Sequence, residues 1–585
     1  MPVRDRERGS ALVIVMLLMA LLMTLVVGYF MLTYIETSAT GASLNGARGF
    51  YGAEAGLNIR AGDIRDTFLG FNRPSGTSPD NGSGRPCDGG DMGSGDYQCE
   101  THALDARVIT TYIEEAAGNP SLVLVPRGER FQNLNAQEYG YQIASSATNP
   151  FGHVEAVLEI EFKSRLIPLF QFAAFYNKDL EILPGPAMAL TGPVHTNGDL
   201  YLTAGITLDI DGQVSSAGEI FRGRKEADAC SAGDVSVADP GTMTPLPGCS
   251  GLRVQLTEAQ LTPWNGMVRR QVDPLTVPPP EALDPDPGQL YWDRADLRIM
   301  LDLDSGPPVI EVRNSSNSAD VARTVDLASC AVAAYTNTFY NHREAANIEM
   351  MDVDVVALLD CAHNQLLLED SRALDDDTEG GLVIYLGVEG TDMNGINNYG
   401  VRVYNGAELE STAVGAPAIL GLTVVTNQAI YVEGNYNAID KKPAAFIADS
   451  LNVLSNAWND ANSALVLSSR IASSTTINAG FLAGTDTSGG TEGSGGQDLG
   501  QYNGGLENYP RFHEDWTGRT LTYRGSFVSL YAPRHVDGLW SAQSYSAPIR
   551  DWDYDTDFND AVNLPPISPR FVYLKQELFV RQFEF

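Results

Sequence analysis

The stretch SALVIVMLLMALLMTLVVGYFMLTYI, residues 10–35, decides how the amino-terminal part of the chain is organised, because it contains no charged side chain. As a helix it would extend roughly 39 Å at about 1.5 Å per residue, which is enough to cross a bilayer. The apolar core of a secretory signal is shorter, at about 7 to 15 residues. We therefore predict a membrane helix that is retained.

A short hydrophilic leader, MPVRDRERG at residues 1–9, precedes this stretch. Its basic residues Arg4, Arg6 and Arg8 favour the cytoplasmic side, where the flanks of membrane helices carry excess Lys and Arg. We expect a single-pass membrane protein with its head outside the cytoplasm.

An apolar stripe continues beyond the membrane stretch in steps of three and four residues, which is the spacing of one helix face. Its members are Ile35, Ala39, Ala42, Gly46, Phe50, Ala53, Leu57, Ala61, Ile64 and Phe68. The helix is thus predicted over residues 10–68, with its outer half packed on the head. Glycine opposes an isolated helix by about 1 kcal/mol, so close packing or local melting should explain Gly41, Gly46, Gly49, Gly52, Gly56 and Gly62.

Two runs in this region, RERGSALVIVMLLMALL at 6–22 and ARGFYGAEAGLNIRAG at 47–62, resemble the amino terminus of PilX-type minor pilins of type IV pili. The resemblance covers roughly the first 65 residues. It implies cleavage after Gly9 by a prepilin peptidase, N-methylation of Ser10, and partners among other minor pilins and a tip adhesin. The alternative is a plain single-span anchor.

One position departs from the major pilins. They carry a glutamate at the fifth mature residue, which is thought to meet the amino group of the subunit ahead, and this chain has Ile14 there. Without that glutamate the helix carries no unpaired carboxylate inside the membrane. A subunit at the filament tip, with none ahead of it, fits such a sequence.

The charge composition argues against nucleic acid as a partner. The chain has 585 residues, which favours two or three domains, and 74 acidic against 38 basic residues give a net charge of -36. Such a surface repels phosphate backbones, so we expect no nucleic-acid binding.

The six cysteines occur without a CxxC pair or histidines at metal-ligand spacing. This pattern indicates disulfides in an oxidising compartment. Of the fifteen connectivities that six cysteines allow, we predict the sequential one: Cys87 with Cys99, Cys230 with Cys249, and Cys330 with Cys361.

Residues 69–165 are predicted to form a loop and a small antiparallel sheet. The part from 69 to 100 is rich in Gly, Ser, Pro, Asp and Asn, which is typical of a loop. Strands are predicted at 107–115, 122–125, 139–146 and 153–162 from their apolar alternation. A sheet packed on the outer half of a long helix is the plan of a pilin.

A repeat of 20 residues follows. Leu180, Leu200 and Ile220 fall at equal places in it, as do Gly192 and Gly212, and VHTNGDLYL from Val194 resembles VVTNQAIYV from Val424. Units this short must stack to bury an apolar face. We predict a parallel β-helix over 171–533, with an insertion at about 222–420 and a C-terminal segment at 534–585, so the fold is mixed α and β.

The sequence contains no recognisable catalytic motif. The histidines are scattered, and no HExxH, GxxxxGK or GxSxG arrangement occurs. β-helices include polysaccharide enzymes, for which His195, or Asp179 with Asp199 one rung above, would be the candidates. Polar residues at equal register are also what any solenoid shows, and we expect no enzyme.

No cofactor is expected, with Ca²⁺ as the one ion to consider. Four aspartates alternate in DWDYDTD, and such oxygen-rich clusters suit calcium. They are Asp551, Asp553, Asp555 and Asp557. The EF-hand pattern fails here, because its glycine and glutamate places hold Thr556 and Val562. The alternating acids equally fit one face of a solvated strand, and the acidic loop 375–377 is a weaker candidate.

These observations together predict a minor pilin that primes filament assembly and presents a β-helical head at or near the tip, with adhesion as one use. The head, with blocks such as NGGLENYPRFHEDWTGRTLTYRGS at 503–526, resembles an uncharacterised bacterial ectodomain that follows PilX-type amino termini. The alternatives are a secretion-system tip pseudopilin and a membrane-tethered carbohydrate-active β-helix enzyme.

Overall fold

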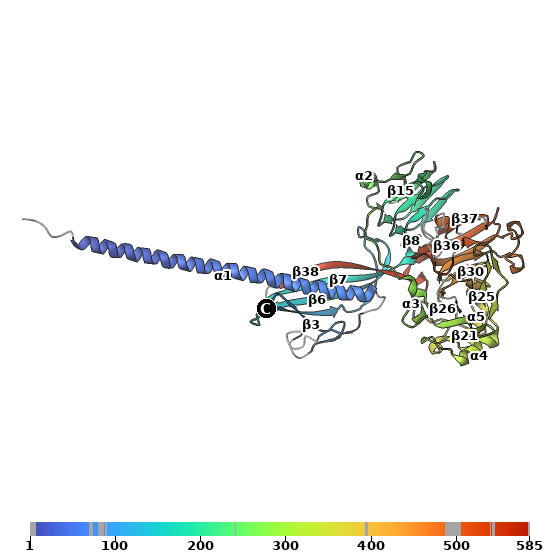
Figure 1. Cartoon of the computed structure of the whole chain (residues 1–585), viewed down its shortest axis with the longest axis horizontal. Coiled ribbons are helices and arrows are strands. Elements are labelled where there is room, and N and C mark those ends of the chain that lie inside the picture. The colour runs from blue at the N-terminus through green and yellow to red at the C-terminus, as the bar shows by residue number, and fades with distance from the viewer. Residues whose placement is uncertain are drawn as a thin grey trace, which may run out of the picture. The chain divides into compact units, whose positions relative to one another are not determined.

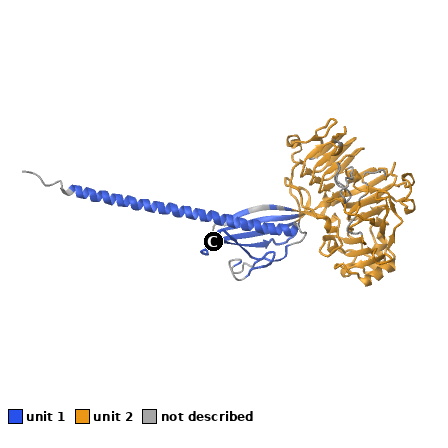
Figure 2. Cartoon of the chain, viewed as in Figure 1, with its two compact units in different colours: residues 1–121, 138–165, 573–585 blue, residues 122–137, 166–572 orange. Residues whose placement is uncertain are grey.

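The structure is a computed structural model that describes residues 8–69, 74–79, 87, 91–239, 241–391, 396–485, 505–536, 538, 540 and 544–582. It combines a long amino-terminal helix with a large β-rich part (Figure 1). The chain divides into two compact units (Figure 2). The first comprises residues 1–121, 138–165 and 573–585, and the second comprises residues 122–137 and 166–572.

The first unit contains helix α1 (Arg8–Leu69), a small pair of strands, and one sheet. The sheet has the strand order β3-β4-β6-β7-β38, with β5 beside β6. The strands are β1 (Gly76–Thr77), β2 (Ser94–Gly95), β3 (Glu100–Leu104), β4 (Arg107–Glu115), β5 (Ser121–Leu124), β6 (Asn135–Thr148), β7 (Val154–Pro168) and β38 (Arg570–Gln582). β3 with β4 and β4 with β6 are antiparallel, and all four predicted strand segments are strands.

The core of the first unit lies between α1 and this sheet. Ile109, Ile113 and Ile143 occupy alternate places on β4 and β6 and are fully buried, because alternation sends every second side chain to one face. Leu57 and Ile64 of α1 are buried with them. Removing this apolar surface from water is the main force that holds the helix to the sheet.

The second unit begins with coils that repeat every 20 residues. Leu200 pairs with Leu180 on one side and with Ile220 on the other, in parallel register. Val194 pairs likewise with Ala174 and Val214, and Met188 pairs with Leu208. The predicted period therefore appears as backbone pairing between successive coils.

These coils contribute three sets of stacked strands. They are β8 (Ala174–Tyr176), β11 (Val194–Thr196), β14 (Val214–Ser216) and β19 (Val268–Arg269); β9 (Leu180–Ile182), β12 (Leu200–Leu202), β15 (Ile220–Arg222) and β18 (Val254–Gln255); and β10 (Met188–Thr191), β13 (Thr207–Asp211), β16 (Asp234–Asp239) and β17 (Thr242–Pro245).

A second group of coils joins the first through one long sheet. Its order is β19-β14-β11-β8-β36-β34-β32-β29-β26-β20-β21, so β8 has β11 on one side and β36 on the other. The added strands are β20 (Leu297–Asp302), β21 (Val309–Arg313), β26 (Leu382–Glu389), β29 (Leu422–Val425), β32 (Ala444–Ala448), β34 (Thr475–Ala483) and β36 (Thr520–Ser529). The matched TN dipeptides lie at the end of β11 and directly after β29, and these two strands belong to the same sheet.

A six-stranded sheet accompanies this group, with the order β22-β25-β27-β30-β33-β35, and it is parallel except for β22, which runs antiparallel to β25. Its strands are β22 (Ala333–Thr336), β25 (Glu349–Asp354), β27 (Tyr399–Tyr404), β30 (Ala429–Glu433), β33 (Ser450–Leu454) and β35 (Arg511–Phe512). The remaining elements are α2 (Glu258–Leu261), α3 (Leu290–Asp293), α4 (Val321–Cys330), α5 (Val355–Gln365), β23 (Tyr340–Asn341), β24 (Ala346–Asn347), β28 (Gly406–Glu408), β31 (Tyr436–Ile439) and β37 (Ile549–Tyr554).

At three places an outer strand runs in the opposite direction to the strand beside it. β21 runs antiparallel to β20, and β17 and β18 run antiparallel to β16 and β15. Short antiparallel strands at these places end the parallel pairing, which would otherwise offer an open edge to another chain.

The structure differs from the predicted boundaries in two places. β25, β26 and β27 lie inside the predicted insertion at 222–420, yet each pairs in parallel with a neighbouring strand of the stack. The predicted C-terminal segment at 534–585 is divided, since β37 pairs with β36 and β38 belongs to the sheet of the first unit. In the same region, helix α5 begins after Asp354, whose carboxylate caps the helix by accepting from the Ala357 N–H at 2.9 Å.

The repeat explains a glycine that the sequence alone does not. A Cβ on Gly205 would lie 2.4 Å from the Gly185 carbonyl oxygen of the preceding coil, whereas a Cβ on Gly185 would meet nothing within 4 Å. Gly205→Ala must therefore push two coils apart, and we expect a loss of about 1–3 kcal/mol in unfolding free energy.

Denaturation followed by tryptophan fluorescence measures this loss, because the chain has six tryptophans and all lie in the second unit. Gly185→Ala is the matched control at the same register and should change stability by less than about 0.5 kcal/mol. Equal effects of the two substitutions would contradict the packing explanation.

Candidate functional site: the amino-terminal helix and its sheet

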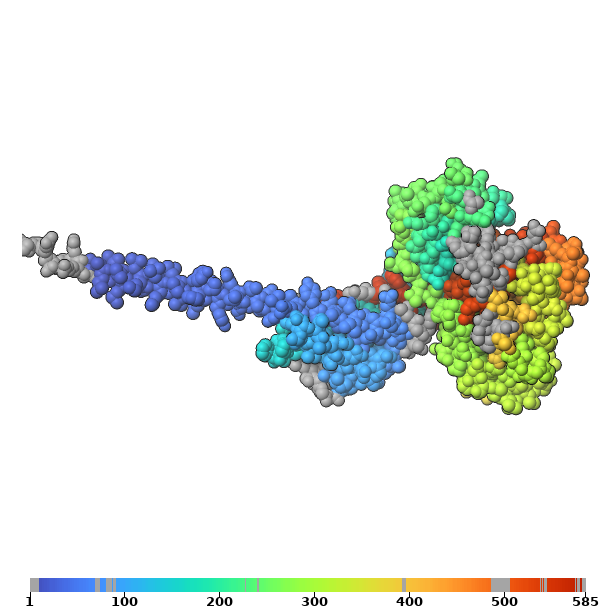
Figure 3. Space-filling model, in the orientation of Figure 1, coloured from blue at the N-terminus to red at the C-terminus, as the bar shows by residue number. Residues whose placement is uncertain are grey.

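The first part of α1, residues 10–48, which we call its inner half, is exposed. In the range 10–48 almost every residue is exposed, including Leu12, Met23 and Phe30 at 66%, 73% and 69% (Figure 3). This part is long and apolar enough to cross a membrane. It fits single-pass anchoring near the amino terminus, because apolar side chains of this number are stable only when lipid or other protein covers them.

The outer half of α1 is packed. Ala53, Leu57, Ile64 and Phe68 are at most 2% exposed, and they belong to the stripe predicted from the sequence. Phe50 contacts Phe579 of β38, with ring centroids 6.1 Å apart. The earlier members Ile35, Ala39 and Ala42 are exposed. These exposed members of the stripe therefore lie outside the part of α1 that packs on the sheet of this chain.

Three of the six glycines in this region bring the helix against the sheet. A Cβ on Gly56 would lie 2.5 Å from Ser145 Oγ and 2.7 Å from a methyl group of Ile109. A Cβ on Gly52 would lie 2.8 Å from Ile109, and one on Gly49 would lie 2.5 Å from the Glu155 Cβ. Close packing, one of the two predicted explanations, accounts for these positions. Gly41, Gly46 and Gly62 have nothing within 4 Å of such a Cβ.

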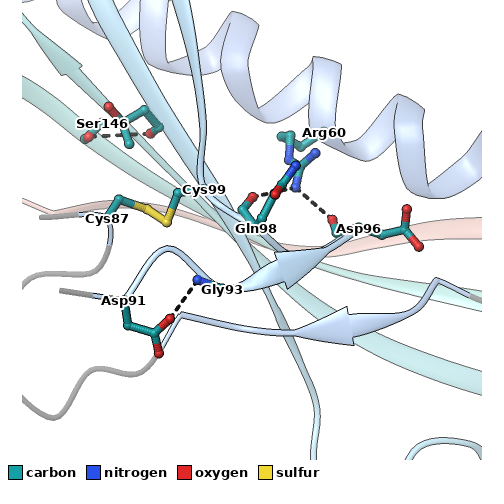
Figure 4. Close-up of a disulfide and its surroundings, with 9 residues drawn as sticks. Arg60, Cys87, Asp91, Gly93, Asp96, Gln98, Cys99 and Ser146 are labelled. Atoms are coloured by element: carbon teal, nitrogen blue, oxygen red, sulfur yellow. Dashed lines mark hydrogen bonds between the residues drawn. A yellow bond between two sulfur atoms is a disulfide. The ribbon is translucent and has the colours of Figure 1, made fainter. Parts of the chain in front are cut away.

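A buried arginine ties the first disulfide-bonded segment to the helix (Figure 4). Arg60 is 2% exposed, and its Nη2 donates to the carbonyls of Asp96 at 2.8 Å and Gln98 at 3.0 Å. Its Nη1 donates to the Glu100 carboxylate at 2.6 Å. The disulfide Cys87–Cys99 lies in the same segment. This polar contact fixes the start of the sheet against the outer half of α1.

All six cysteines are joined in sequence order. The bonds are Cys87–Cys99, Cys230–Cys249 and Cys330–Cys361, with Cα atoms 5.6, 6.1 and 6.0 Å apart. The third bond joins Cys330, the last residue of α4, to Cys361 inside α5.

The residues predicted for processing lie at the beginning of α1. Gly9 and Ser10 are in its first turn, and residues 1–7 of the leader lie outside the described residues. Ile14 is 57% exposed. Cleavage and methylation at these positions remain predictions.

The side chains considered for catalysis make contacts within the stack of strands. Asp179 accepts from the Asp199 N–H at 2.8 Å, and Asp199 accepts from the Glu219 N–H at 2.7 Å, so each caps the next coil. His195 is fully buried between Ser215 Oγ at 2.8 Å and Asn197 Oδ1 at 3.2 Å. Burial lowers the pKa of His195 to about 4, which keeps the ring neutral.

The carboxylates of the four aspartates considered for calcium bind protein groups other than one another. Asp551 pairs with Arg524, Asp553 accepts from the Thr191 N–H at 2.7 Å, and Lys441 binds Asp555 and Asp557. Trp552, Tyr554 and Phe558 are buried, as expected for the solvated-strand interpretation. In the loop 375–377, Asp376 accepts from the Thr378 N–H at 3.2 Å. Within the described ranges, no three His, Cys, Asp or Glu side chains are placed to hold a metal ion.

Two buried carboxyl groups were not predicted from the sequence. Burial is the main cause that raises the pKa of Glu507 and of Glu514 to about 7. Glu507 accepts from the Leu183 N–H at 2.8 Å, and Glu514 accepts from the N–H and hydroxyl of Ser455 at 2.6 and 2.7 Å. Each carboxyl group binds a residue far away in the sequence, so a search for local sequence patterns could not find these contacts.

Comparison of sequences gives no match, since no family model and no curated protein matches the chain. Among solved structures it is similar to the competence-associated pilin ComZ from Thermus thermophilus. The identity is 12%, the match covers 92% of this chain and 98% of that one, and the TM-score is 0.25. A TM-score this low carries no argument about fold or function.

From the helix–sheet contact we predict that alanine substitutions at two glycines of α1 change the stability in opposite directions. Gly56→Ala places a methyl group against β4 and β6, so we expect faster hydrogen exchange over 107–115 and a loss of about 1–3 kcal/mol. Gly62→Ala fills open space and improves helix propensity, with a gain of up to about 1 kcal/mol. Mass-detected hydrogen exchange of the full chain in detergent measures both. Destabilisation by both substitutions would count against close packing as the reason for Gly56.

The pKa of Glu507 predicts how the second unit responds to pH. Between the ordinary value of 4.5 and about 7, the folded unit holds a proton that the unfolded chain has lost. Stability is therefore highest at the acidic end of this window and falls as pH rises through it, by about 1 kcal/mol per pH unit for one group. Glu507→Gln keeps an acceptor for the Leu183 N–H and should flatten the decline.

Denaturant titrations followed by tryptophan fluorescence at several pH values from 5 to 8 measure this decline. Glu410→Gln, a change at an exposed site, is the control and should leave the slope unchanged. A wild-type slope preserved in Glu507→Gln would contradict the assignment.

Proposed function

We propose that the chain is a minor pilin of a type IV pilus or related filament, of the PilX type, that primes assembly and presents its head at or near the tip. The observation that carries the proposal is the division of α1 into a bare apolar half and a half packed by glycines on a sheet. A plain anchor needs only the first half. A filament subunit needs both, because the same helix must sit in lipid and later pack among other subunits.

The tip position rests on Ile14 and on the exposed stripe that precedes the packed half. An isoleucine at the fifth mature place leaves nothing to pair with a subunit ahead. The exposed Ala39 and Ala42 leave a helix face for subunits alongside. The partners would be a prepilin peptidase, other minor pilins and a tip adhesin, with the inner membrane as the site before assembly.

We class the second unit as a β-helical head that binds rather than catalyses, with adhesion as its use. The assignment as a β-helix is supported by the parallel pairing of strands 20 residues apart. The assignment as a binding unit without catalysis is supported by the structural roles of His195, Asp179 and Asp199. A secretion-system tip pseudopilin is the second candidate, since it would share the helix and the missing glutamate. Neighbouring genes for secretion pseudopilins would favour it, and glycan depolymerisation by the full chain would favour an enzyme.

Processing gives the direct test. The mature chain purified from membranes should begin at Ser10 and carry one added methyl group on its amino terminus, as read by intact mass and terminal peptide sequencing. Gly9→Leu should leave the leader attached and remove the protein from sheared surface filaments. Gly46→Leu, outside the cleavage site, should still be cleaved. A wild-type amino terminus at Met1 or Pro2 would remove the pilin assignment.

A further inference from the structure

The last part of the inner half of α1 connects the membrane stretch to the packed outer half. It comprises residues 36–47, ETSATGASLNGA, which we call the linker segment. Every residue in it is exposed except Gly46, which is partly buried. The sheet of the first unit meets α1 just beyond it, where Arg48 lies 3.7 Å from Asp105 (Figure 1). The linker segment is therefore a helix with little packing of its own.

Both neighbours of the linker segment are held in the helical state by their surroundings. Inside a bilayer the backbone must satisfy its own hydrogen bonds, so residues 10–35 stay helical in lipid. Tyr29 and Tyr34 stand near the outer end of this stretch, where aromatic side chains favour the headgroup layer. On the other side, Ala53 and Leu57 are buried against the sheet. Neither constraint reaches the linker segment.

The linker segment has little helix propensity of its own. Seven of its twelve residues are Gly, Ser, Thr or Asn, which disfavour a helix relative to alanine. They are Thr37, Ser38, Thr40, Gly41, Ser43, Asn45 and Gly46. No acidic and basic residues stand three or four positions apart within it, so ion pairs along the helix do not compensate. An isolated helix of about 12 residues is marginal in water even when it is made of good helix formers.

Threonine hydroxyls in this part of α1 also compete for backbone carbonyls. Thr40 Oγ1 donates to the Glu36 carbonyl at 2.7 Å, and the Thr37 hydroxyl donates to the Thr33 carbonyl. Such a bond gives the carbonyl a second donor, which slightly destabilises and bends a helix. Because water reaches the same carbonyls, the net loss is small when a helical hydrogen bond opens there.

Packing does not explain the two glycines of the linker segment. A Cβ on Gly41 or Gly46 would meet nothing within 4 Å, whereas one on Gly56 would lie 2.5 Å from Ser145 Oγ. Each glycine lowers the helix equilibrium by about fivefold relative to alanine. What these two glycines supply is backbone freedom, since glycine adopts more conformations than any other residue.

We infer that the linker segment is a hinge, which unwinds while the helix on both sides of it stays intact. Opening within it lets the packed half of α1 and the sheet of the first unit turn together relative to the membrane stretch. Hinges are short segments, often of small residues, that absorb large changes in φ and ψ. The inference does not rest on the proposed role in a filament, because an anchored protein of any kind would have the same segment.

The test measures the distance across the linker segment in the full chain, reconstituted in lipid nanodiscs. The native cysteines are all disulfide-bonded, so spin labels are attached to Tyr29→Cys and Tyr51→Cys, which are exposed sites. A straight helix places these two sites about 33 Å apart, at about 1.5 Å per residue. We expect pulsed electron resonance to give a broad distance distribution that extends well below this value.

Two variants separate the hinge from general mobility of the helix. Gly41→Ala combined with Gly46→Ala favours the helix without a clash, so the distribution should narrow to one peak at about 33 Å. Hydrogen exchange over 36–47 should slow about 25-fold in this variant, because each alanine favours the helix about fivefold. Gly62→Ala is the matched control, since it also fills open space but lies in the packed half. It should change neither measurement.

Two results would overturn the inference. A single narrow peak at about 33 Å in the wild type would mean that α1 is stiff throughout its length. A broad distribution that the two alanines leave unchanged would mean that the mobility does not arise from the linker segment. Neither result bears on the proposed filament role, which is tested separately by the mature amino terminus.

Discussion

The parallel pairing of β8 with β36 is the contact on which the second unit depends. Through it, Ala174, Phe175 and Tyr176 of the first coil join Phe527, Val528 and Ser529 of the last long strand. The coils that follow β8 extend the sheet in one direction, and those that precede β36 along the chain extend it in the other. Without this contact there would be two shorter stacks, each with an open edge. The edge strands of a parallel stack are its weakest part, and joining two stacks removes one edge from each.

The same contact explains how the second unit can be inserted into the sequence of the first unit. Because the first and last coils are neighbours, both ends of the unit emerge together, and the Leu169 N–H donates to the Pro569 carbonyl at 2.7 Å. The strands that follow outward, β7 and β38, are adjacent in the sheet of the first unit. The head is therefore an insertion between two neighbouring strands. Insertions are tolerated where the ends of the inserted unit lie close together, and here the first unit gains a sixth strand from the far end of the sequence.

Sequence reasoning succeeded where the signal was local. The membrane stretch, the helical stripe through Phe68 and the coils at Leu180, Leu200 and Ile220 all depend on spacings of a few residues or on one constant period. It did not find the coils at 349–404, because the distance between stacked strands grows from 20 to 40 residues, as Leu382 pairs with Leu422. No period remains to be read there. β38 could not be assigned to the first sheet either, since its partner β7 lies some 400 positions earlier.

Four crossings of the chain connect the two units, at 121/122, 137/138, 165/166 and 572/573. This number has a mechanical consequence. A tensile load between them is divided over four backbone segments instead of one. Each segment continues into a strand whose neighbours are hydrogen-bonded along its length, so the load is resisted in shear across several bonds at once. The insertion topology thus supplies an attachment suited to traction.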